Sequence, residues 1–193
     1  MKKILILLVC VLFTKIVSAQ KELLSFNEQN KYTYFQVITQ AGSPVDTLQL
    51  RALYFLKKNY PKDKIKQADT AAAFTGTDKF LVYDGISLTR HESGEIHYTY
   101  NIACKDQKYK YWLTDFVFTP YKMDRYSNYV PETAIDIPLE EGLSKLEKKQ
   151  LENYLDQTGI FCKNFGIKLK QYMLNISALP KEGNKKTIST KDW

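Results

Sequence analysis

Alternation of apolar and polar side chains in residues 98–114 is the feature that most constrains the fold of this chain. If Asp106 and Gln107 form a two-residue turn, the flanking segments pair as an antiparallel hairpin. One face then carries an apolar set: Cys104 opposite Tyr109, Ile102 opposite Tyr111, and Tyr100 opposite Leu113. The other face carries a mainly polar set: Asn101 opposite Trp112, Thr99 opposite Thr114, and Ala103 opposite Lys110. The pattern predicts an antiparallel sheet with one covered face and one wet face.

Several segments predict the partners of this hairpin. Residues 31–39 are aromatic and β-branched and predict a strand. Ser43 as the cap, Pro44 in the first turn and Asp46 as the acidic member of a capping box predict a helix that ends near residue 59. Residues 65–83 predict short strands broken at 69–70 and at Gly76. A further hairpin is predicted around a Ser93-Gly94 turn.

The C-terminal part predicts a loop followed by a long helix. Residues 122–141 have no clean period and are predicted to be a long loop. Ser144 and Glu147 form a second capping-box pattern. An apolar stripe at helical spacing then runs from Leu143 to Tyr172, with Gly159 and Gly166 as points where the helix could kink.

The predicted fold class is therefore α+β, an antiparallel sheet with helices packed on one face and a long C-terminal helix. The predicted organisation has a signal peptide over residues 1–19 and an N-terminal lead over 20–30. A single domain follows over 31–175, and a flexible polar tail over 176–193.

The leader is predicted from three features at the N-terminus. Lys2 and Lys3 are basic, residues 4–13 are an unbroken apolar run, and Val17-Ser18-Ala19 offers a small-residue cleavage site. Ten apolar residues are too few to cross a bilayer, which needs about 20 in a helix. We expect an exported, periplasmic or secreted protein with no membrane span after cleavage, the alternatives being a membrane anchor or a buried core helix.

Removal of the leader weakens the charge argument for a nucleic-acid partner. The chain has a formal net charge of +7, and loss of Lys2, Lys3 and Lys15 lowers it to +4. Part of the remainder lies in the tail, so no basic stripe of the kind that binds nucleic acid is expected. Export also argues against a nucleic-acid partner, and we expect none.

Cys104 and Cys162 remain after cleavage, in a compartment where disulfides persist. A bridge between them is possible. Two free cysteines on the core faces of their elements are the alternative.

Several of these residues resemble a known family. The residues are Tyr34 to Ile38 leading through a short turn into a helix, Ile96 to Ile102, the hairpin Lys105-Asp106-Gln107-Lys108-Tyr109-Lys110-Tyr111, and Thr114-Asp115-Phe116. Over residues 32–173 the chain resembles the exported bacterial "domain of unknown function with TBP-like fold" family. Members usually carry glycine in the hairpin turn, where this chain has Gln107. The resemblance implies the fold, a signal peptide and an envelope setting, and it supplies no activity.

His91 and His97, with Glu92 and Glu95 between them, are the candidate metal ligands of the chain. The two histidines would point to opposite faces of a hairpin with a Ser93-Gly94 turn, so no metal site is expected; a three-residue loop, which would bring them together, is the alternative. No catalytic residue and no cofactor is assigned. The alternative is a hydrolase of envelope polymers that uses His91 or His97 with loop carboxylates such as Glu132.

The preferred hypothesis is a non-enzymatic module that binds an envelope protein or a cell-surface ligand such as a glycan. Its predicted surface is the open sheet face together with the 122–141 loop. The six candidate residues are Trp112, Asn101, Tyr34, Gln36, Tyr126 and Tyr129. A structural subunit that needs a partner for its stability is the third possibility, and the oligomeric state is left open.

Overall fold

The computed structural model describes residues 23–60, 66–67, 73–85 and 89–174. The predicted leader (1–19), residues 20–22 of the predicted lead and the predicted tail (176–193) lie outside these residues, as does the break predicted at residues 69–70.

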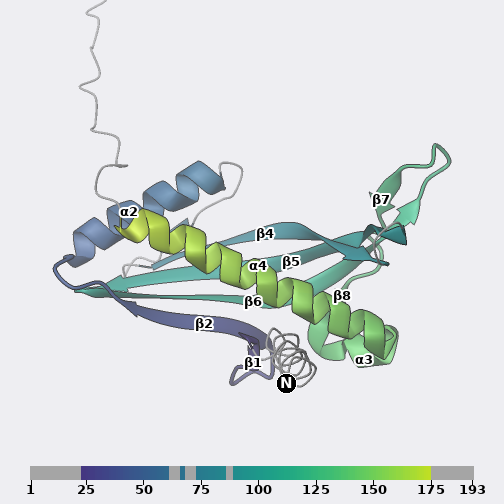
Figure 1. Cartoon of the computed structure of the whole chain (residues 1–193), viewed down its shortest axis with the longest axis horizontal. Helices are drawn as coiled ribbons and strands as arrows, with labels where there is room; N and C mark the ends of the chain where they lie inside the picture. The colour runs from purple at the N-terminus through teal and green to yellow at the C-terminus, as the bar shows by residue number, and fades with distance from the viewer. Residues whose placement is uncertain (1–22, 61–65, 68–72, 86–88, 175–193) are drawn as a thin grey trace, which may run out of the picture.

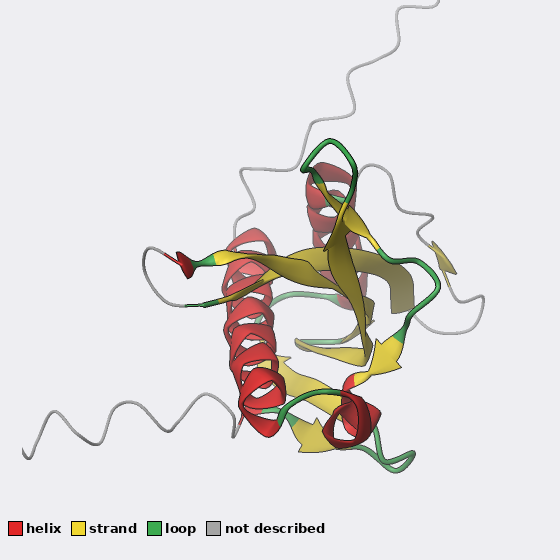
Figure 2. Cartoon of the chain, turned by 90° about the vertical axis from the view of Figure 1, so that its right-hand side faces the viewer, coloured by secondary structure: helices red, strands yellow, loops and turns green. Residues whose placement is uncertain are grey.

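The described residues form one antiparallel sheet with helices on one side (Figures 1 and 2). In chain order the elements are β1 (Ser25–Phe26), β2 (Tyr32–Thr39), α2 (Val45–Asn59), β3 (Lys66–Gln67), β4 (Ala73–Asp84), β5 (His91–Lys105), β6 (Lys108–Met123), β7 (Tyr129–Pro131), β8 (Ile137–Pro138), the 3-10 helix η3 (Leu139–Glu141), α3 (Gly142–Lys145) and α4 (Lys148–Leu174). The strand order is β1-β2-β6-β5-β4-β3, and β7 and β8 also pair with β6.

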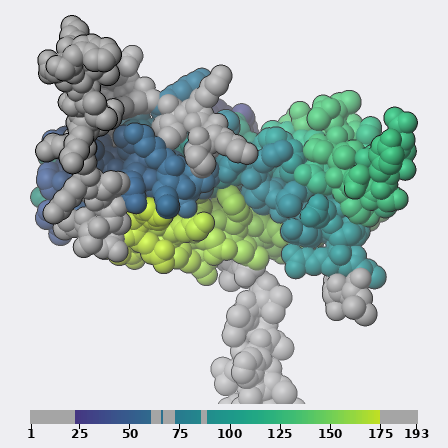
Figure 3. All heavy atoms as spheres, turned by 90° about the horizontal axis from the view of Figure 1, so that it is seen from above, coloured from purple at the N-terminus to yellow at the C-terminus, as the bar shows by residue number. Residues whose placement is uncertain are grey.

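Helices α2 and α4 cover the same face of the sheet and lie side by side over part of α4 (Figures 1 and 3). The core between them and the sheet is rich in aromatic rings. Phe165 of α4 contacts Phe55 of α2 and both Tyr100 and Tyr111 of the sheet. The predicted fold class, with its covered face and long C-terminal helix, is confirmed.

The hairpin that opened the sequence argument has the predicted register. Cys104 pairs with Tyr109, Asn101 with Trp112, and Tyr100 with Leu113. Gln107 in the turn has a φ of 57°, a left-handed conformation that glycine adopts more readily. The apolar set faces the core as expected, whereas Thr114 on the other face is also buried.

Two glycines predicted to interrupt strands lie inside continuous strands. The expected Ser93-Gly94 turn is wrong, because β5 runs unbroken through Gly94 and the β4–β5 connection lies earlier in the chain. A Cβ at Gly94 would collide with the Thr119 carbonyl oxygen and the Phe118 ring, and one at Gly76 of β4 would collide with the Tyr100 hydroxyl. At each glycine, atoms of a neighbouring strand leave no room for a side chain.

The predicted loop over residues 122–141 is largely ordered structure. β6 continues to Met123, a tight turn follows, and β7 returns antiparallel with Tyr121 paired to Pro131. We refer to residues 121–131 as the arm, which projects from one end of the sheet (Figure 1). β8, η3 and α3 then lead to α4. Residues 122–141 show no single hydrophobic periodicity because they form several short elements in succession.

Both predicted capping boxes are wrong. Helix α2 begins at Val45, whose N–H donates to the Asp106 side chain of the hairpin turn at 3.0 Å. Ser43 is buried instead, with its hydroxyl 3.5 Å from the guanidinium of the buried Arg51. Ser144 lies within α3, where its hydroxyl donates to the Glu141 carbonyl.

Helix α4 is one continuous element that passes through Gly159 and Gly166. Both glycines face the sheet and are buried. The predicted apolar stripe holds from Leu151 to Tyr172, whose ring packs on Phe55, whereas Leu143 lies in α3 and is 70% exposed.

Candidate functional site

β2 joins the sheet beside the hairpin, as predicted, but with its faces reversed. Tyr34 pairs with Leu113 and Gln36 with Tyr111, which places both on the helix side of the sheet. Tyr34 is buried in the core, and Gln36 is exposed only because β2 lies near the sheet edge. The placement of Tyr34 and Gln36 on the open face is therefore wrong.

The residues that do lie beside Trp112 on the open face are Phe35 and Val37. Phe35 pairs directly with Trp112, and Val37 pairs with Lys110. The side chains of Phe35 and Val37 are 50% and 53% exposed, and Trp112 is half-buried. We refer to Phe35, Val37 and Trp112 as the ledge. Two exposed apolar residues at an i, i+2 spacing next to a tryptophan form a patch that water solvates poorly.

Other open-face residues frame the ledge. Asn101 pairs with Trp112 from β5, as predicted, and is half-buried. The Lys110 ammonium lies 5.3 Å from the centre of the Trp112 ring, within range of a cation–π interaction. This contact places a positive charge directly over the aromatic part of the ledge.

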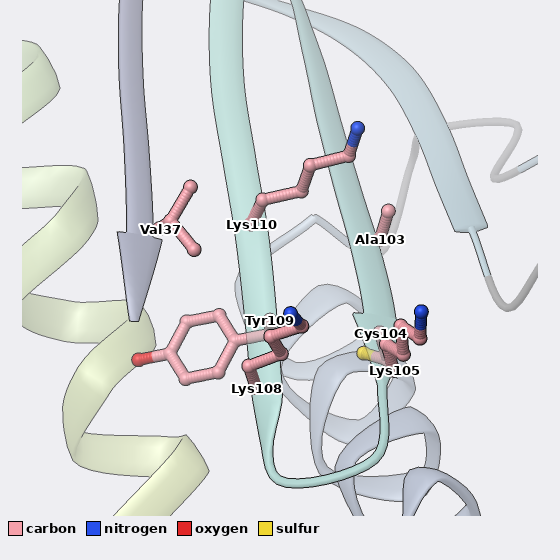
Figure 4. Close-up of a pocket in the computed structure, with 7 residues that line it drawn as sticks. All are labelled: Val37, Ala103, Cys104, Lys105, Lys108, Tyr109 and Lys110. Carbon is pink, nitrogen blue, oxygen red and sulfur yellow. The ribbon is translucent and has the colours of Figure 1, made fainter. Parts of the chain in front are cut away.

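A surface hollow of about 370 Å³ lies at the Val37 end of the ledge (Figure 4). Its floor includes Val37, Ala103 and Cys104, and three lysines also line it, namely Lys105, Lys108 and Lys110. No acidic side chain lines this hollow. Figure 4 shows Lys110 reaching along the sheet beside Ala103, while the Tyr109 ring extends to the other side of the strand. The hollow is therefore apolar at its base and positively charged at its rim.

A second hollow of about 540 Å³ lies at the Phe35 end of the ledge. Phe35, Trp112 and Lys110 form one side of it, and Phe26 with the loop 27–29 forms the other. Phe26 is 59% exposed and stacks on Tyr32. Together the two hollows extend the apolar surface of the ledge in both directions along the strands.

The tyrosines of the arm do not border the ledge. Tyr126 and Tyr129 are exposed as expected, with 73% and 42% of their surface accessible. Trp112 and Met123 lie at opposite ends of β6, eleven residues or about 36 Å apart along the strand. The arm is therefore a separate surface, and its turn is held by Asp124, whose side chain accepts the N–H groups of Tyr126 and Asn128. These bonds lower the pKa of Asp124.

A buried carboxylate lies on the open face between the ledge and the arm, and its burial was not predicted from the sequence, which placed Glu95 at a solvated hairpin tip. Glu95 of β5 is only 4% exposed. Its oxygens lie 2.8 Å from the Lys79 ammonium, 3.0 Å from His97 Nε2 and 2.9 Å from the Tyr121 hydroxyl. Burial alone would raise the pKa of Glu95, but these partners lower it. Burial and the Glu95 carboxylate raise the pKa of Tyr121 to about 12.

The geometry that the hydrolase alternative needs is not formed. His97 is engaged with Glu95, His91 stacks near Tyr129, and Glu132 pairs with Lys122 at 3.3 Å. His91 and His97 are six residues apart on one strand, about 20 Å. Each therefore has a different partner, and no described carboxylate joins the two histidines.

Cys104 and Cys162 are both free in the structure, which does not form the possible bridge. Cys104 lies at the turn end of β5, whereas Cys162 faces the sheet further along, near Tyr98 and Tyr111. Burial raises the pKa of Cys104 to about 12 and also raises that of Cys162. Both thiols are therefore neutral at pH 7, which makes them poor nucleophiles.

Two further features are absent from the described residues. They contain no group of three or more His, Cys, Asp or Glu side chains placed to hold a metal ion. Within the same ranges, no helix is both long enough and apolar enough to cross a membrane.

Known proteins with a similar structure share the fold of this chain, and the comparison assigns no activity to it. No curated protein matches the chain. A TBP-like protein from Parabacteroides distasonis superimposes with a TM-score of 0.60 at 15% identity, over 75% of this chain and 94% of that one. A DUF4468 family protein from Bacteroides ovatus gives 0.56 at 13% identity, over 85% and 95% of the two chains. Residues 34–119 match the model of a domain of unknown function (DUF4468) with TBP-like fold. The family resemblance predicted from the hairpin and its neighbouring strands is therefore confirmed over residues 34–119, which match a DUF4468 domain with TBP-like fold.

Proposed function

We propose that this chain is an exported, non-enzymatic module that binds an acidic segment of a partner protein across the ledge. The observation that carries the proposal is the exposed apolar row of Phe35, Val37 and Trp112. Scattered exposed apolar residues are normal, but a contiguous row between two hollows is typical of an interaction surface.

The charge around the ledge supports an acidic partner. Lys105, Lys108 and Lys110 line the hollow beside Val37, and no acid lines it with them. Carboxylates of a bound segment would gain charge-assisted hydrogen bonds there, while its apolar side chains cover the ledge. Opposite charges across the interface would also accelerate association.

The composition of the ledge favours a protein over a glycan. A sugar stacks on flat aromatic rings, which Trp112 and Phe35 could provide. Val37 and the three lysines of the neighbouring hollow add no such platform, whereas they match the apolar and acidic side chains of a peptide segment. Export rests on the leader predicted from residues 1–19, which places the partner in the cell envelope or outside the cell.

The test uses a photo-crosslinking amino acid at Val37 of the chain expressed in its native cell. A matched probe replaces Ile160, which is 41% exposed on α4 on the helix side. We expect the Val37 probe alone to capture one reproducible protein other than a second copy of this chain, through an acidic peptide. Equal capture from both probes, or a glycan adduct at Val37, would overturn the proposal.

Binding of the purified partner to variants of this chain then tests the contributions of individual residues. Trp112→Ala and Lys108→Glu should each weaken binding about tenfold or more, by removing an aromatic anchor and by reversing a charge. Ile160→Ala is the matched control and should bind as the wild type does. Affinity that survives both Trp112→Ala and Lys108→Glu would show that this surface is not the site.

Export is tested separately by the N-terminal sequence of the protein recovered from the envelope fraction or the medium. Cleavage after Ala19 should leave Gln20 at the N-terminus. An intact leader, or recovery only from the cytoplasm, would contradict this part of the proposal.

A further inference from the structure

Strand β2 has a long outer edge with no neighbouring strand among the described residues. β6 pairs with β2 from Tyr34 to Thr39 on its inner side. On the outer side, β1 pairs only with Tyr32 and Thr33. Residues 34–39 therefore present a row of outward backbone N–H and C=O groups, which can template the addition of another strand.

Nothing in the sequence of this edge discourages strand addition. Residues 34–38 read Tyr-Phe-Gln-Val-Ile, with no charge, no proline and no glycine. Aromatic and β-branched residues of this kind favour strands. Phe35, Gln36 and Val37 are exposed in succession, so both faces of β2 are open at this edge. An incoming strand would meet no described side chain that covers these three residues.

The opposite side of the sheet is guarded in two ways. β4 carries Asp78 and Lys79 in its middle, and charges on an edge oppose further pairing. Near its end, the Gln157 side chain of α4 binds both the N–H and the C=O of Tyr83. The β4 side of the sheet is therefore protected against further strand pairing, whereas the outer edge of β2 is not. We expect another strand to pair with the β2 edge.

We propose that the partner is a second copy of this chain, paired antiparallel through β2 about a two-fold axis near Gln36. The segment is close to self-complementary under this symmetry. With the axis at Gln36, Phe35 lies opposite the second copy's Val37, and Tyr34 lies opposite its Ile38. Both pairs are apolar, and such cross-strand pairs stabilise a sheet.

A shift of the axis to Val37 gives an equally compatible register. Phe35 then lies opposite the second copy's Thr39, and Gln36 opposite its Ile38. Neither register puts like charges in contact, because the nearest lysines, Lys108 and Lys110, belong to β6, one strand behind the edge. The pairing is isologous and closed, so each copy covers the free edge of the other and no further copy can add.

This inference does not depend on the proposed partner protein. It predicts that the two sheets become one, with the two ledges side by side across the axis. Failure of the dimer would leave the partner site on each copy intact, and failure of partner binding would leave the dimer intact.

The first experiment is sedimentation equilibrium of the chain from Gln20 onward over a concentration series. The wild type should give a reversible monomer–dimer equilibrium. Gln36→Lys and Val37→Lys each place like charges at or beside the axis and should shift the protein to the monomer. Leu81→Lys is the matched control, because Leu81 is 40% exposed on the open face of β4 and the dimer should survive. Circular dichroism checks that every variant is folded.

A cysteine scan then locates the axis. Gln36→Cys should form a disulfide-linked dimer if the axis passes through Gln36, and Val37→Cys if it passes through Val37, because only a residue on the axis faces itself. Leu81→Cys and the wild type, with Cys104 and Cys162, should form none. A wild type that stays monomeric at every concentration, or a dimer that persists in both lysine variants, would overturn the proposal.

Discussion

The hydroxyl of Tyr111, on the core face of β6, occupies the space that a Cβ at Gly166 of α4 would need. At this point α4 therefore packs on the sheet through a residue with no side chain. Phe165 beside it contacts the same tyrosine ring at 5.9 Å between centroids. The Tyr111 hydroxyl fits against α4 because Gly166 has no Cβ.

Gly166→Ala should lower the free energy of unfolding by about 1–3 kcal/mol, the usual cost of overpacking a core. Helix propensity alone predicts the opposite sign, a gain of about 1 kcal/mol for alanine over glycine. Denaturant unfolding measures the difference, and Ile167→Ala, at an exposed neighbour, is the control. Adding Tyr111→Phe to Gly166→Ala should recover part of the loss, since it removes the atom nearest the new Cβ. A more stable Gly166→Ala variant would contradict this account of the packing.

The hairpin of β5 and β6 could be predicted residue by residue because its information is local. A two-residue turn fixes the register, and the register fixes which side chains share a face. The pairs from Cys104–Tyr109 to Tyr100–Leu113 follow from these two facts. Helix coverage of the apolar face follows in turn.

The placement of β2 could not be predicted in the same way. Aromatic residues occupy both parities of the strand, at Tyr34 and Phe35, so alternation does not say which side is buried. The answer depends on the pairing of Phe35 with Trp112, which are far apart in the sequence. The roles of Gly76 and Gly94 could not be predicted for a related reason, since the atoms that exclude a side chain at each lie on another strand.

The Glu95 cluster predicts a specific loss of stability in acid. The pKa of Glu95 is lowered in the folded protein below the ordinary value of 4.5. The charged form therefore stabilises the fold above the unfolded pKa, and this contribution is lost as the pH falls through the folded pKa. Denaturant unfolding of the wild type over pH 3–7 should show a decline in stability below about pH 4.5, the usual range for a glutamate.

Glu95→Gln should remove the Glu95 part of this pH dependence. It should also destabilise the protein at neutral pH by about 1–3 kcal/mol, because Lys79 and Tyr121 lose a charged acceptor. Glu132→Gln is the control, since its ion pair with Lys122 is solvent-exposed and should change stability by less than about 1 kcal/mol. Identical pH profiles for the wild type and Glu95→Gln would show that Glu95 is not linked to folding.

The two cysteines should be protected from thiol reagents while the protein is folded. Burial raises the pKa of Cys104 to about 12 and raises that of Cys162, so little thiolate exists at pH 7. Alkylation followed by mass spectrometry should be slow in buffer and should label both residues in denaturant. Cys104, which lines the hollow beside Val37, should react before the buried Cys162. Rapid labelling of Cys162 under native conditions would contradict the packing of α4.

The side chain of Gln157 binds the backbone of Tyr83 near the end of β4, in the place where a neighbouring strand would otherwise pair. Its Oε1 accepts the Tyr83 N–H at 3.0 Å, and its Nε2 donates to the Tyr83 carbonyl at 2.8 Å. Gln157→Ala should leave that N–H without its partner and lower the free energy of unfolding by about 1–3 kcal/mol. Gln171→Ala, at an exposed site on the same helix, should have an effect within about 0.5 kcal/mol.

Hydrogen exchange at the Tyr83 amide separates this bond from the general packing of α4. Gln157→Ala should lose protection at Tyr83, whereas Gln157→Glu keeps a carboxylate oxygen that can accept the same N–H. The glutamate variant should therefore keep the protection while it loses stability, because it no longer donates to the Tyr83 carbonyl. That carbonyl keeps its bond from Asn153 at 2.9 Å in both variants, so the contrast isolates the N–H. Equal exchange rates in the alanine and glutamate variants would show that the amide is protected by burial and not by Gln157.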